Sequence, residues 1–247
     1  MSTSSTTGYS KADIHMHTNL GDGWASPTQV IQQASRRGLP VIAITDHDHV
    51  EGARRVADLL AKQEHPPFEM ITGVEVSTRQ GHLLGLFIER APKALRSVEE
   101  SIEAIKEQGG LVVIPHPLGR LVPSLSRSKI DELLNKGFTI DGIEIYNPSP
   151  ANASMRATVR AANQQWHFAE TGGSDAHFWQ HIGAAYTLFP GSTAEDLRQG
   201  ILARTVQAGG QETPPEHLPA AAYVAQCAWS WFVDPPRRMM RALRSPS

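Results

Sequence analysis

The sequence predicts an α/β fold in which a closed or nearly closed barrel of strands is surrounded by helices. Its 247 residues, 40% of them hydrophobic, are enough for the core of one α/β barrel domain. Short apolar runs alternate with stretches of helical length, which indicates a parallel sheet covered by helices. This many strand–helix units within about 200 residues favour a barrel over an open sheet, and barrels carry their chemistry at the carboxyl ends of the strands.

The predicted strands are short runs rich in Val, Ile and Leu, the composition of strands that are buried on both faces. The third and fourth runs are separated by a turn at Gly81. The predicted strands cover residues 13–17, 41–45, 70–76, 83–88, 111–115, 142–146 and 168–172.

The predicted helices begin at polar capping residues and end at glycines. Ser26 followed by Pro27 is a helix start, because serine accepts a hydrogen bond from a free N–H and proline fits the first helical position. Gly38 ends that helix, because glycine adopts the left-handed conformation readily. Similar signals predict helices over residues 27–37, 51–62, 97–108, 128–135, 151–165 and 193–203.

The two ends of the chain differ from the barrel region, residues 11–208. Residues 1–10 are rich in Ser and Thr, so we expect a disordered tail there. Residues 209–247 form an apolar and basic extension that contains Trp229 and Trp231. We expect a C-terminal helix packed on the barrel exterior; the alternatives are a peripheral membrane contact with acidic lipid or a homo-oligomer contact.

Composition excludes several classes of protein. The single cysteine, Cys227, rules out an internal disulfide framework and suits a cytoplasmic location. No apolar run reaches the roughly 18 residues that a membrane span needs. The net charge is −2 although residues 237–247 hold four arginines and no acid, so the rest of the chain is acidic. We therefore expect no stable nucleic-acid partner, which leaves a small nucleotide possible as a substrate.

Polar residues of metal-binding type follow nearly every predicted strand. His15 and His17 are two residues apart on an extended segment, so their side chains project to the same side and can hold one metal ion. A barrel gathers the other strand ends around the same mouth. The histidines and carboxylates at these positions are His15, His17, Asp22, Asp46, His47, Glu75, His82, His116, Asp175 and His177.

Mixed imidazole and carboxylate ligands suit divalent manganese, iron or zinc. Such ions lower the pKa of water and neutralise phosphoryl oxygens, which is the chemistry of a metal-dependent hydrolase. The turn Gly172-Gly173-Ser174 lacks the G-x-S-x-G pattern of a serine nucleophile. The residues themselves therefore predict hydrolysis that depends on metal ions.

The motifs resemble those of the polymerase-and-histidinol-phosphatase (PHP) domain family over about residues 11–189. They are HxH at 15–17, ITDHD at 44–48, GVE at 73–75 followed by HLLG at 82–85, His116-Pro117 and GSDAH at 173–177. The resemblance implies a distorted, TIM-like (β/α)7 barrel that hydrolyses phosphate esters with two or three metal ions. The family's usual Ser-Asp-Gly reads Gly21-Asp22-Gly23 here, so the geometry around Asp22 differs from the family pattern.

The resemblance also implies a role for each position. By this comparison, the ligands are His15 and His17 with bridging Glu75 and Asp175 for one metal, His82 and His116 with Glu75 for a second, and Asp22, His47 and His177 for a third. We expect catalytic roles for Glu75, Asp175 and Asp46. Of these, Asp46 is expected to orient a histidine or to accept a proton. We expect Arg120, Arg127 and Asn147 to bind substrate, since arginine suits phosphate.

The predicted function is hydrolysis of a small phosphate ester, monoester or diester, by a metal-bound hydroxide at a trinuclear site. The short links at 75–82 and 88–97 leave no room for the insertion of family members that act on nucleoside bisphosphates or RNA ends. One alternative is a non-catalytic metal-binding domain, against which the complete ligand set argues. The other is an amidohydrolase-type enzyme for C–N or C–O bonds; those barrels usually carry a bridging lysine, and no lysine follows a strand here.

Overall fold

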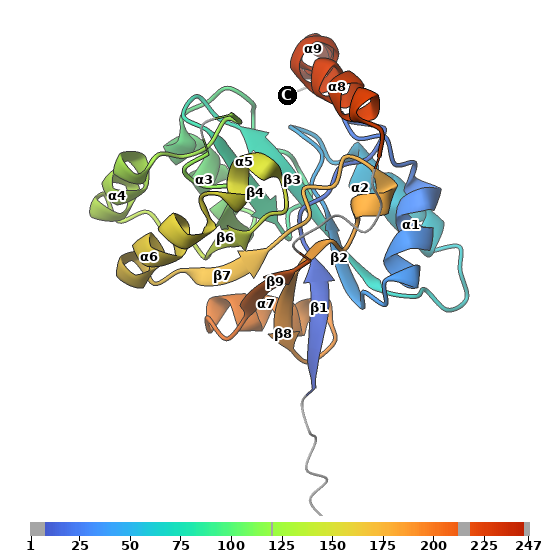
Figure 1. Cartoon of the computed structure of the whole chain (residues 1–247), viewed down its shortest axis with the longest axis horizontal. Coiled ribbons are helices and arrows are strands. Elements are labelled where there is room, and N and C mark those ends of the chain that lie inside the picture. The colour runs from blue at the N-terminus through green and yellow to red at the C-terminus, as the bar shows by residue number, and fades with distance from the viewer. Residues whose placement is uncertain (1–7, 120, 212–217, 245–247) are drawn as a thin grey trace, which may run out of the picture.

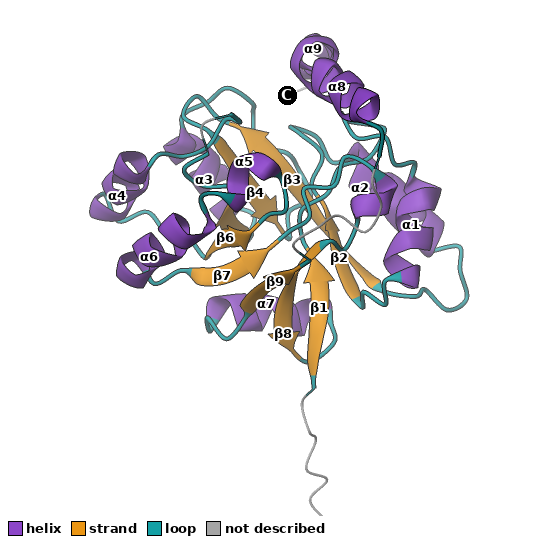
Figure 2. Cartoon of the chain, viewed as in Figure 1, coloured by secondary structure: helices purple, strands orange, loops and turns teal. Residues whose placement is uncertain are grey.

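The strands of the computed structural model form one curled sheet with helices around it (Figures 1 and 2). The structure describes residues 8–119, 121–211 and 218–244. Within them the strand order is β7-β6-β5-β4-β3-β2-β1-β8-β9, a distorted barrel, so the predicted fold class is confirmed. The strands are β1 (Tyr9–Asp13), β2 (Val41–Ile44), β3 (Glu69–Ser77), β4 (His82–Leu86), β5 (Leu111–Ile114), β6 (Gly142–Tyr146), β7 (Ala169–Gly172), β8 (Ala185–Pro190) and β9 (Gln207–Gly210).

The helices begin where the capping residues predict. Ser26, Ser97 and Thr193 each accept a hydrogen bond from the backbone of the third helical residue, whose side chain bonds back to the cap. The α-helices are α1 (Pro27–Arg36), α2 (Glu51–Leu60), α3 (Val98–Lys106), α4 (Arg127–Asn135), α5 (Pro150–Ala153), α6 (Arg156–Trp166), α7 (Ala194–Leu202), α8 (Ala220–Ala228) and α9 (Asp234–Arg244). A 3-10 turn, η1 (Trp179–His181), follows β7, and a π-helical turn, η2 (Trp229–Val233), joins α8 to α9.

The sheet departs from the prediction in strand number and direction. The described residues contain β8 and β9 in addition to the seven predicted strands. β9 was missed because its sequence, Gln-Ala-Gly-Gly, has no apolar run. The sheet is also not all parallel: β3 and β4 form an antiparallel hairpin, and β4–β5, β1–β8 and β8–β9 are antiparallel pairs.

Smaller boundaries also shift. β1 begins at Tyr9, inside the segment expected to be a tail, because Tyr9 and Ser10 pair with β8; residues 1–7 lie outside the described residues. The helix predicted over 151–165 is divided into α5 and α6. No helix in the described part of the chain has the length and apolar character needed to cross a membrane.

The barrel is nearly closed by side-chain hydrogen bonds between β7 and β8. The Thr187 hydroxyl accepts a hydrogen bond from the N–H of Gly172 (3.0 Å) and donates one to its carbonyl (2.9 Å). A Cβ atom on Gly172 would lie 2.5 Å from the carbonyl oxygen of Tyr186, so the close approach requires glycine. One end of the sheet thereby folds back towards the other.

Apolar packing fills the barrel at the end away from the polar residues. Leu197 and Ile201 of α7 pack with strand residues such as Val41, Leu84 and Val113, all buried. Two further apolar clusters join the outer helices to the sheet, one including residues of α3, α4 and α6, the other residues of α1 and α2. The core therefore holds the strands rigidly and leaves the polar chemistry at their opposite ends.

Candidate metal centre

The predicted metal-binding residues meet because the segments after the strands remain paired. Met16 forms an isolated parallel bridge with Ala176, and His47 forms one with Glu75. The N–H of His17 donates to the carbonyl of Ala176 (3.0 Å), and that of Asp175 donates to the carbonyl of His15 (2.8 Å). Backbone pairing thus continues beyond the strands and fixes where the side chains point.

Glu75 lies at the centre of the cluster, with each carboxylate oxygen facing two imidazoles. Its Oε2 is 3.1 Å from Nε2 of His15 and 3.2 Å from Nε2 of His17. Its Oε1 is 2.7 Å from Nδ1 of His82 and 2.8 Å from Nε2 of His116. A carboxylate shared in this way is placed to bridge two cations.

Asp175 and Asp22 add carboxylates on either side. Oδ1 of Asp175 lies 3.5 Å from Nε2 of His15 and 3.3 Å from Nε2 of His17. Oδ2 of Asp22 lies 3.0 Å from Nε2 of His177. The described residues contain three groups whose ligand atoms lie within 4.8 Å of one another: His15, His17, Glu75 and Asp175; His17, Asp22 and His177; His47, Glu75 and His82.

These groups differ in part from the sets implied by the resemblance. His47 groups with Glu75 and His82, because its Nε2 is 3.6 Å from Oε2 of Glu75 and 3.9 Å from Oδ2 of Asp22. His17 takes part in two groups, since its Nδ1 also lies 3.3 Å from Oδ1 of Asp22. The observed groups therefore match the first implied ligand set and differ in membership from the other two.

Hydrogen bonds on the far side of the imidazoles fix which nitrogen faces inward. Nδ1 of His15 lies 3.0 Å from Oε1 of Glu144, and Nδ1 of His177 lies 3.0 Å from the carbonyl of Asp175. A neutral imidazole that donates through Nδ1 presents a lone pair at Nε2. For both histidines Nε2 faces a carboxylate oxygen, so a proton or a metal ion has to lie between the two.

Burial makes this demand for a cation stronger. Both ring nitrogens of His17, Nδ1 of His47 and Oδ1 of Asp22 are buried without a hydrogen-bond partner among the described residues. An unsatisfied buried polar atom costs on the order of 1–3 kcal/mol, so native proteins rarely leave several together. The donor set, imidazole nitrogens with carboxylates, fits divalent manganese, iron or zinc.

The electrostatics of the cluster keep the carboxylates charged. Burial opposes ionisation of Glu75, but His47, His82 and His15 outweigh it and hold the pKa of the carboxyl well below its usual range. Burial alone would lower the pKa of His15, yet the carboxylates around it raise that pKa well above its usual value. The cluster therefore attracts positive charge, whether protons or metal ions.

Glu144 supports the cluster and was not among the predicted site residues. Its Oε2 accepts hydrogen bonds from the N–H of His116 (2.8 Å) and from Nδ2 of Asn147 (2.9 Å), while Oε1 orients His15. The residue is 3% exposed. A carboxylate inside the apolar strand Gly142–Tyr146 was the sequence signal that could have found it.

Two predicted site residues form hydrogen bonds with other parts of the site. Asp46 accepts hydrogen bonds from the N–H (2.6 Å) and hydroxyl (2.7 Å) of Thr18, so it anchors the loop that carries Asp22. The catalytic role expected of Asp46 stays a prediction. Asn147 donates to Glu144 and also to Oδ2 of Asp175 (3.3 Å), so it orients a carboxylate of the cluster.

Of the two predicted phosphate-binding arginines, Arg127 lies within the described residues. Arg127 is the first residue of α4, where its guanidinium donates to Gln165 (2.6 Å) and lies over the ring of Trp166. These contacts direct the guanidinium towards α6, and the substrate-binding role expected of Arg127 stays a prediction. Arg120 lies outside the described residues.

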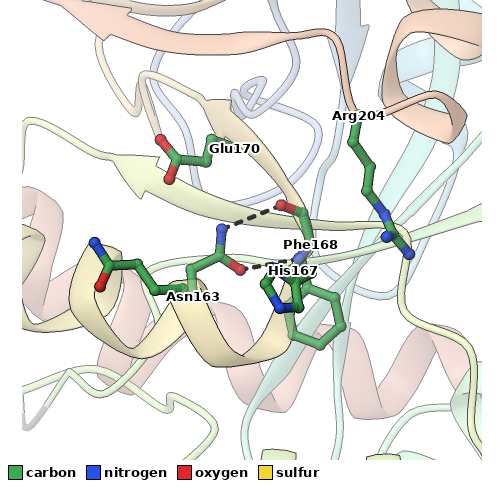
Figure 3. A pocket seen from close by; sticks show the side chains of 6 residues that line it. Asn163, His167, Phe168, Glu170 and Arg204 are labelled. Atoms are coloured by element: carbon green, nitrogen blue, oxygen red, sulfur yellow. Dashed lines mark hydrogen bonds between the residues drawn. The ribbon is translucent and has the colours of Figure 1, made fainter.

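A surface cavity of about 390 Å³ lies at the opposite end of β7 (Figure 3). His167, Glu170 and Arg204 line it, and Asn163 hydrogen-bonds the N–H (3.0 Å) and carbonyl (3.1 Å) of Phe168. These bonds end α6 and start β7, whereas Asp175 follows the other end of that strand. The cavity is therefore not part of the metal cluster.

Comparison with known families and structures agrees with this geometry. The PHP domain model matches residues 13–136, and a PHP-associated model matches residues 156–206. A solved two-domain Bacteroides vulgatus protein, described as containing a predicted PHP-like metal-dependent phosphoesterase, superposes with a TM-score of 0.69 at 19% identity. That match covers 83% of this chain and 65% of the other, and at this identity it shows the fold alone.

Two relatives match more closely in sequence. An uncharacterised Methanocaldococcus jannaschii protein is 35% identical over 149 residues, which are 56% of this chain and 81% of that protein. A 3′,5′-nucleoside bisphosphate phosphatase of Chromobacterium violaceum is 37% identical over 94 residues, or 36% of this chain and 32% of the phosphatase. The similarity to the phosphatase thus spans about a third of its length.

Proposed function

Since the chain belongs to the PHP domain family, we propose that it is a metal-dependent phosphoesterase for small phosphate esters, acting at a centre of two or three divalent ions. The observation that carries the proposal is Glu75, whose two carboxylate oxygens each face two imidazoles. We propose manganese, iron or zinc as the ions. The proposed ligands are His15, His17, Asp22, His47, Glu75, His82, His116, Asp175 and His177.

Bound ions would lower the pKa of water and neutralise phosphoryl oxygens, the two effects that phosphate hydrolysis needs. The protein's part is to position groups. Glu75 holds the two sides of the cluster together, and Glu144 keeps Nε2 of His15 directed inward. Asn147 orients Asp175 by donating to its Oδ2. Groups that are positioned before the substrate binds stabilise the transition state and so raise the rate.

The substrate class is proposed from the relatives. The C. violaceum relative acts on a small phosphorylated nucleoside, as its name states. We propose a small phosphorylated molecule, nucleotides included, as the substrate here. The donor set serves monoesters and diesters alike, so the test must include both.

The test is hydrolysis by the metal-loaded protein of a panel of phosphomonoesters with a phosphodiester reporter in parallel. Glu75→Gln should reduce turnover about a thousandfold, since it removes a charge shared by two sides of the cluster. Glu103→Gln is the matched control, because Glu103 is exposed on the outer helix α3. Full activity of Glu75→Gln, or no hydrolysis by fully metallated wild type, would contradict the proposal.

A further inference from the structure

The C-terminal helical segment, residues 220–244, lies at the mouth of the barrel and not on its exterior as expected. We call this segment, made of α8, η2 and α9, the C-terminal cap. In Figure 1 it lies beyond the end of the sheet to which the β1 arrow points. The Ser230 hydroxyl donates a 2.6 Å hydrogen bond to Oδ2 of Asp22, and Gln226 donates to Ser230 in turn (2.7 Å). The cap thus contacts a residue of the metal cluster directly.

Arg238 is a second attachment point, on the rim between His47 and His82. Its Nη1 lies 2.9 Å from Oδ2 of Asp48 and 2.9 Å from Oγ of Ser77. Asp48 follows His47, and Ser77 is the strand partner of His82. Arg238 also pairs with Asp234 on its own helix at 2.8 Å. With its charge shared between two carboxylates, Arg238 is an anchor and not a spare phosphate receptor.

Tyr223 makes a third attachment, beyond His177. Its hydroxyl lies 3.2 Å from Nε2 of His181, and its ring packs edge-on against Phe178 with centroids 5.5 Å apart. The three attachments surround the mouth, at the loop of Asp22, at the rim of Asp48 and Ser77, and at η1. These contacts hold the cap in a defined position on the barrel.

The cap is turned so that its polar side faces the barrel. Val224, Trp231 and Phe232 are 68%, 61% and 75% exposed, whereas Ser230, Gln226 and Arg238 face the barrel. A helix that packs on an apolar surface buries its apolar residues. The reversed orientation means that specific polar contacts, and not general apolar burial, position the cap.

The metal cluster beside the cap is largely buried. The side chains of His15 and Glu75 are 0% and 1% exposed, and the most accessible ligand, His177, is only 19% exposed. Because the cap is attached at Asp22 and at Asp48, a polymer strand that approaches the cluster from that side would need the space that the cap occupies. The sequence predicted that no inserted domain covers this barrel; the C-terminus takes that place.

We propose that the C-terminal cap determines substrate size, so that the enzyme accepts small phosphate esters and excludes nucleic-acid strands. Ser230 and Arg238 are the positioning residues, acting by seating the cap. This inference rests on the proposed phosphoesterase function.

The test compares Arg238→Ala with Arg237→Ala, a matched control. Arg237 is the adjacent arginine and lies 5.1 Å over the ring of Trp229, within the cap itself. Cys227, the single cysteine, is exposed on α8 and accepts a spin label that reports cap mobility without any catalysis. Turnover of p-nitrophenyl phosphate and of a short 5′-phosphorylated oligonucleotide is measured on the same metal-loaded proteins.

Arg238→Ala should increase the mobility of the label and lower the preference for the small ester about tenfold, the effect of losing charged hydrogen bonds. Arg237→Ala should change neither quantity. The double variant with Ser230→Ala and Arg238→Ala should increase the mobility of the label further. It tests the attachment of the cap to the barrel even if one of the two contacts is redundant.

Two results would overturn the inference: a mobile label with an unchanged preference, or an immobile label in the double variant. If wild type hydrolyses no ester at all, the proposed function fails and the role in specificity fails with it. The mobility of the label would still show whether the cap is attached to the barrel, so the two failures are distinguishable.

Discussion

The metal cluster and the barrel-facing side of the C-terminal cap are both polar, but they are positioned in different ways. The cluster residues extend from paired strands, so the backbone of His17 and of Asp175 is fixed by hydrogen bonds to neighbouring segments. The cap contacts the barrel through a few side chains, with Ser230 reaching Asp22 and Arg238 reaching Asp48. A centre built on the sheet is rigid, whereas a cap seated by side chains can be released by single substitutions.

The largest expected effect comes from a cluster residue. His17→Ala should weaken metal binding by more than about a hundredfold, because His17 lies in two of the three ligand groups. His65→Ala, at an exposed position, should bind metal like wild type. Titration with manganese followed by calorimetry measures both, and equal affinities would show that the cluster does not bind metal through His17.

A supporting residue inside the sheet should have an intermediate effect. Glu144→Gln should lower metal affinity about 10–100-fold, because it weakens the hydrogen bond that orients His15. The same calorimetric titration applies, with Glu103→Gln as the control. An unchanged affinity would mean that backbone pairing alone positions the imidazole.

Metal binding should depend on pH in a defined direction. Asp175, Glu144 and Glu75 outweigh burial and raise the pKa of His15 well above its usual value, so the metal-free ring keeps its proton to higher pH than a free imidazole does. A metal ion must displace that proton, and the affinity should rise about tenfold for each unit of pH per proton released. Calorimetry in buffers of different protonation enthalpy counts the protons; binding without proton release would contradict this reading.

The smallest effect on the metal centre should come from the cap. Ser230→Ala removes one hydrogen bond to Asp22 but leaves His177 beside that carboxylate. Its metal affinity should fall by only a few-fold, on the order of one hydrogen bond. A loss as large as that of His17→Ala would mean that the cap is part of the centre, and the contrast between the two regions would fail.

The cluster was predictable because its residues are recognised from their immediate neighbours in the sequence. His15 and His17 share a face by their spacing alone, and a barrel collects such strand ends wherever they fall in the chain. β9 could not be predicted in this way, since its Gln-Ala-Gly-Gly sequence becomes a strand only by pairing with β8. Propensity is overridden there by tertiary pairing.

The tasks of individual side chains were harder to predict. Asp46 directly precedes His47, yet its hydrogen bonds go to Thr18, which nothing in the local sequence reveals. The contact of Ser230 with Asp22 joins residues 208 positions apart. The apolar residues Trp231 and Phe232 suggested packing on the barrel or a contact outside it, and the structure leaves them exposed while the polar side docks. Long-range polar contacts of this kind have no periodic signal.

Phosphate release by the protein before and after removal of metal ions decides whether the cluster is a metal-dependent phosphoesterase centre. Chelation should abolish hydrolysis of the preferred ester, and adding back manganese, iron or zinc singly should restore it in proportion to the metal bound. Elemental analysis of the same samples should give two or three ions per chain at full activity. Undiminished hydrolysis by protein shown to contain no metal would contradict the account.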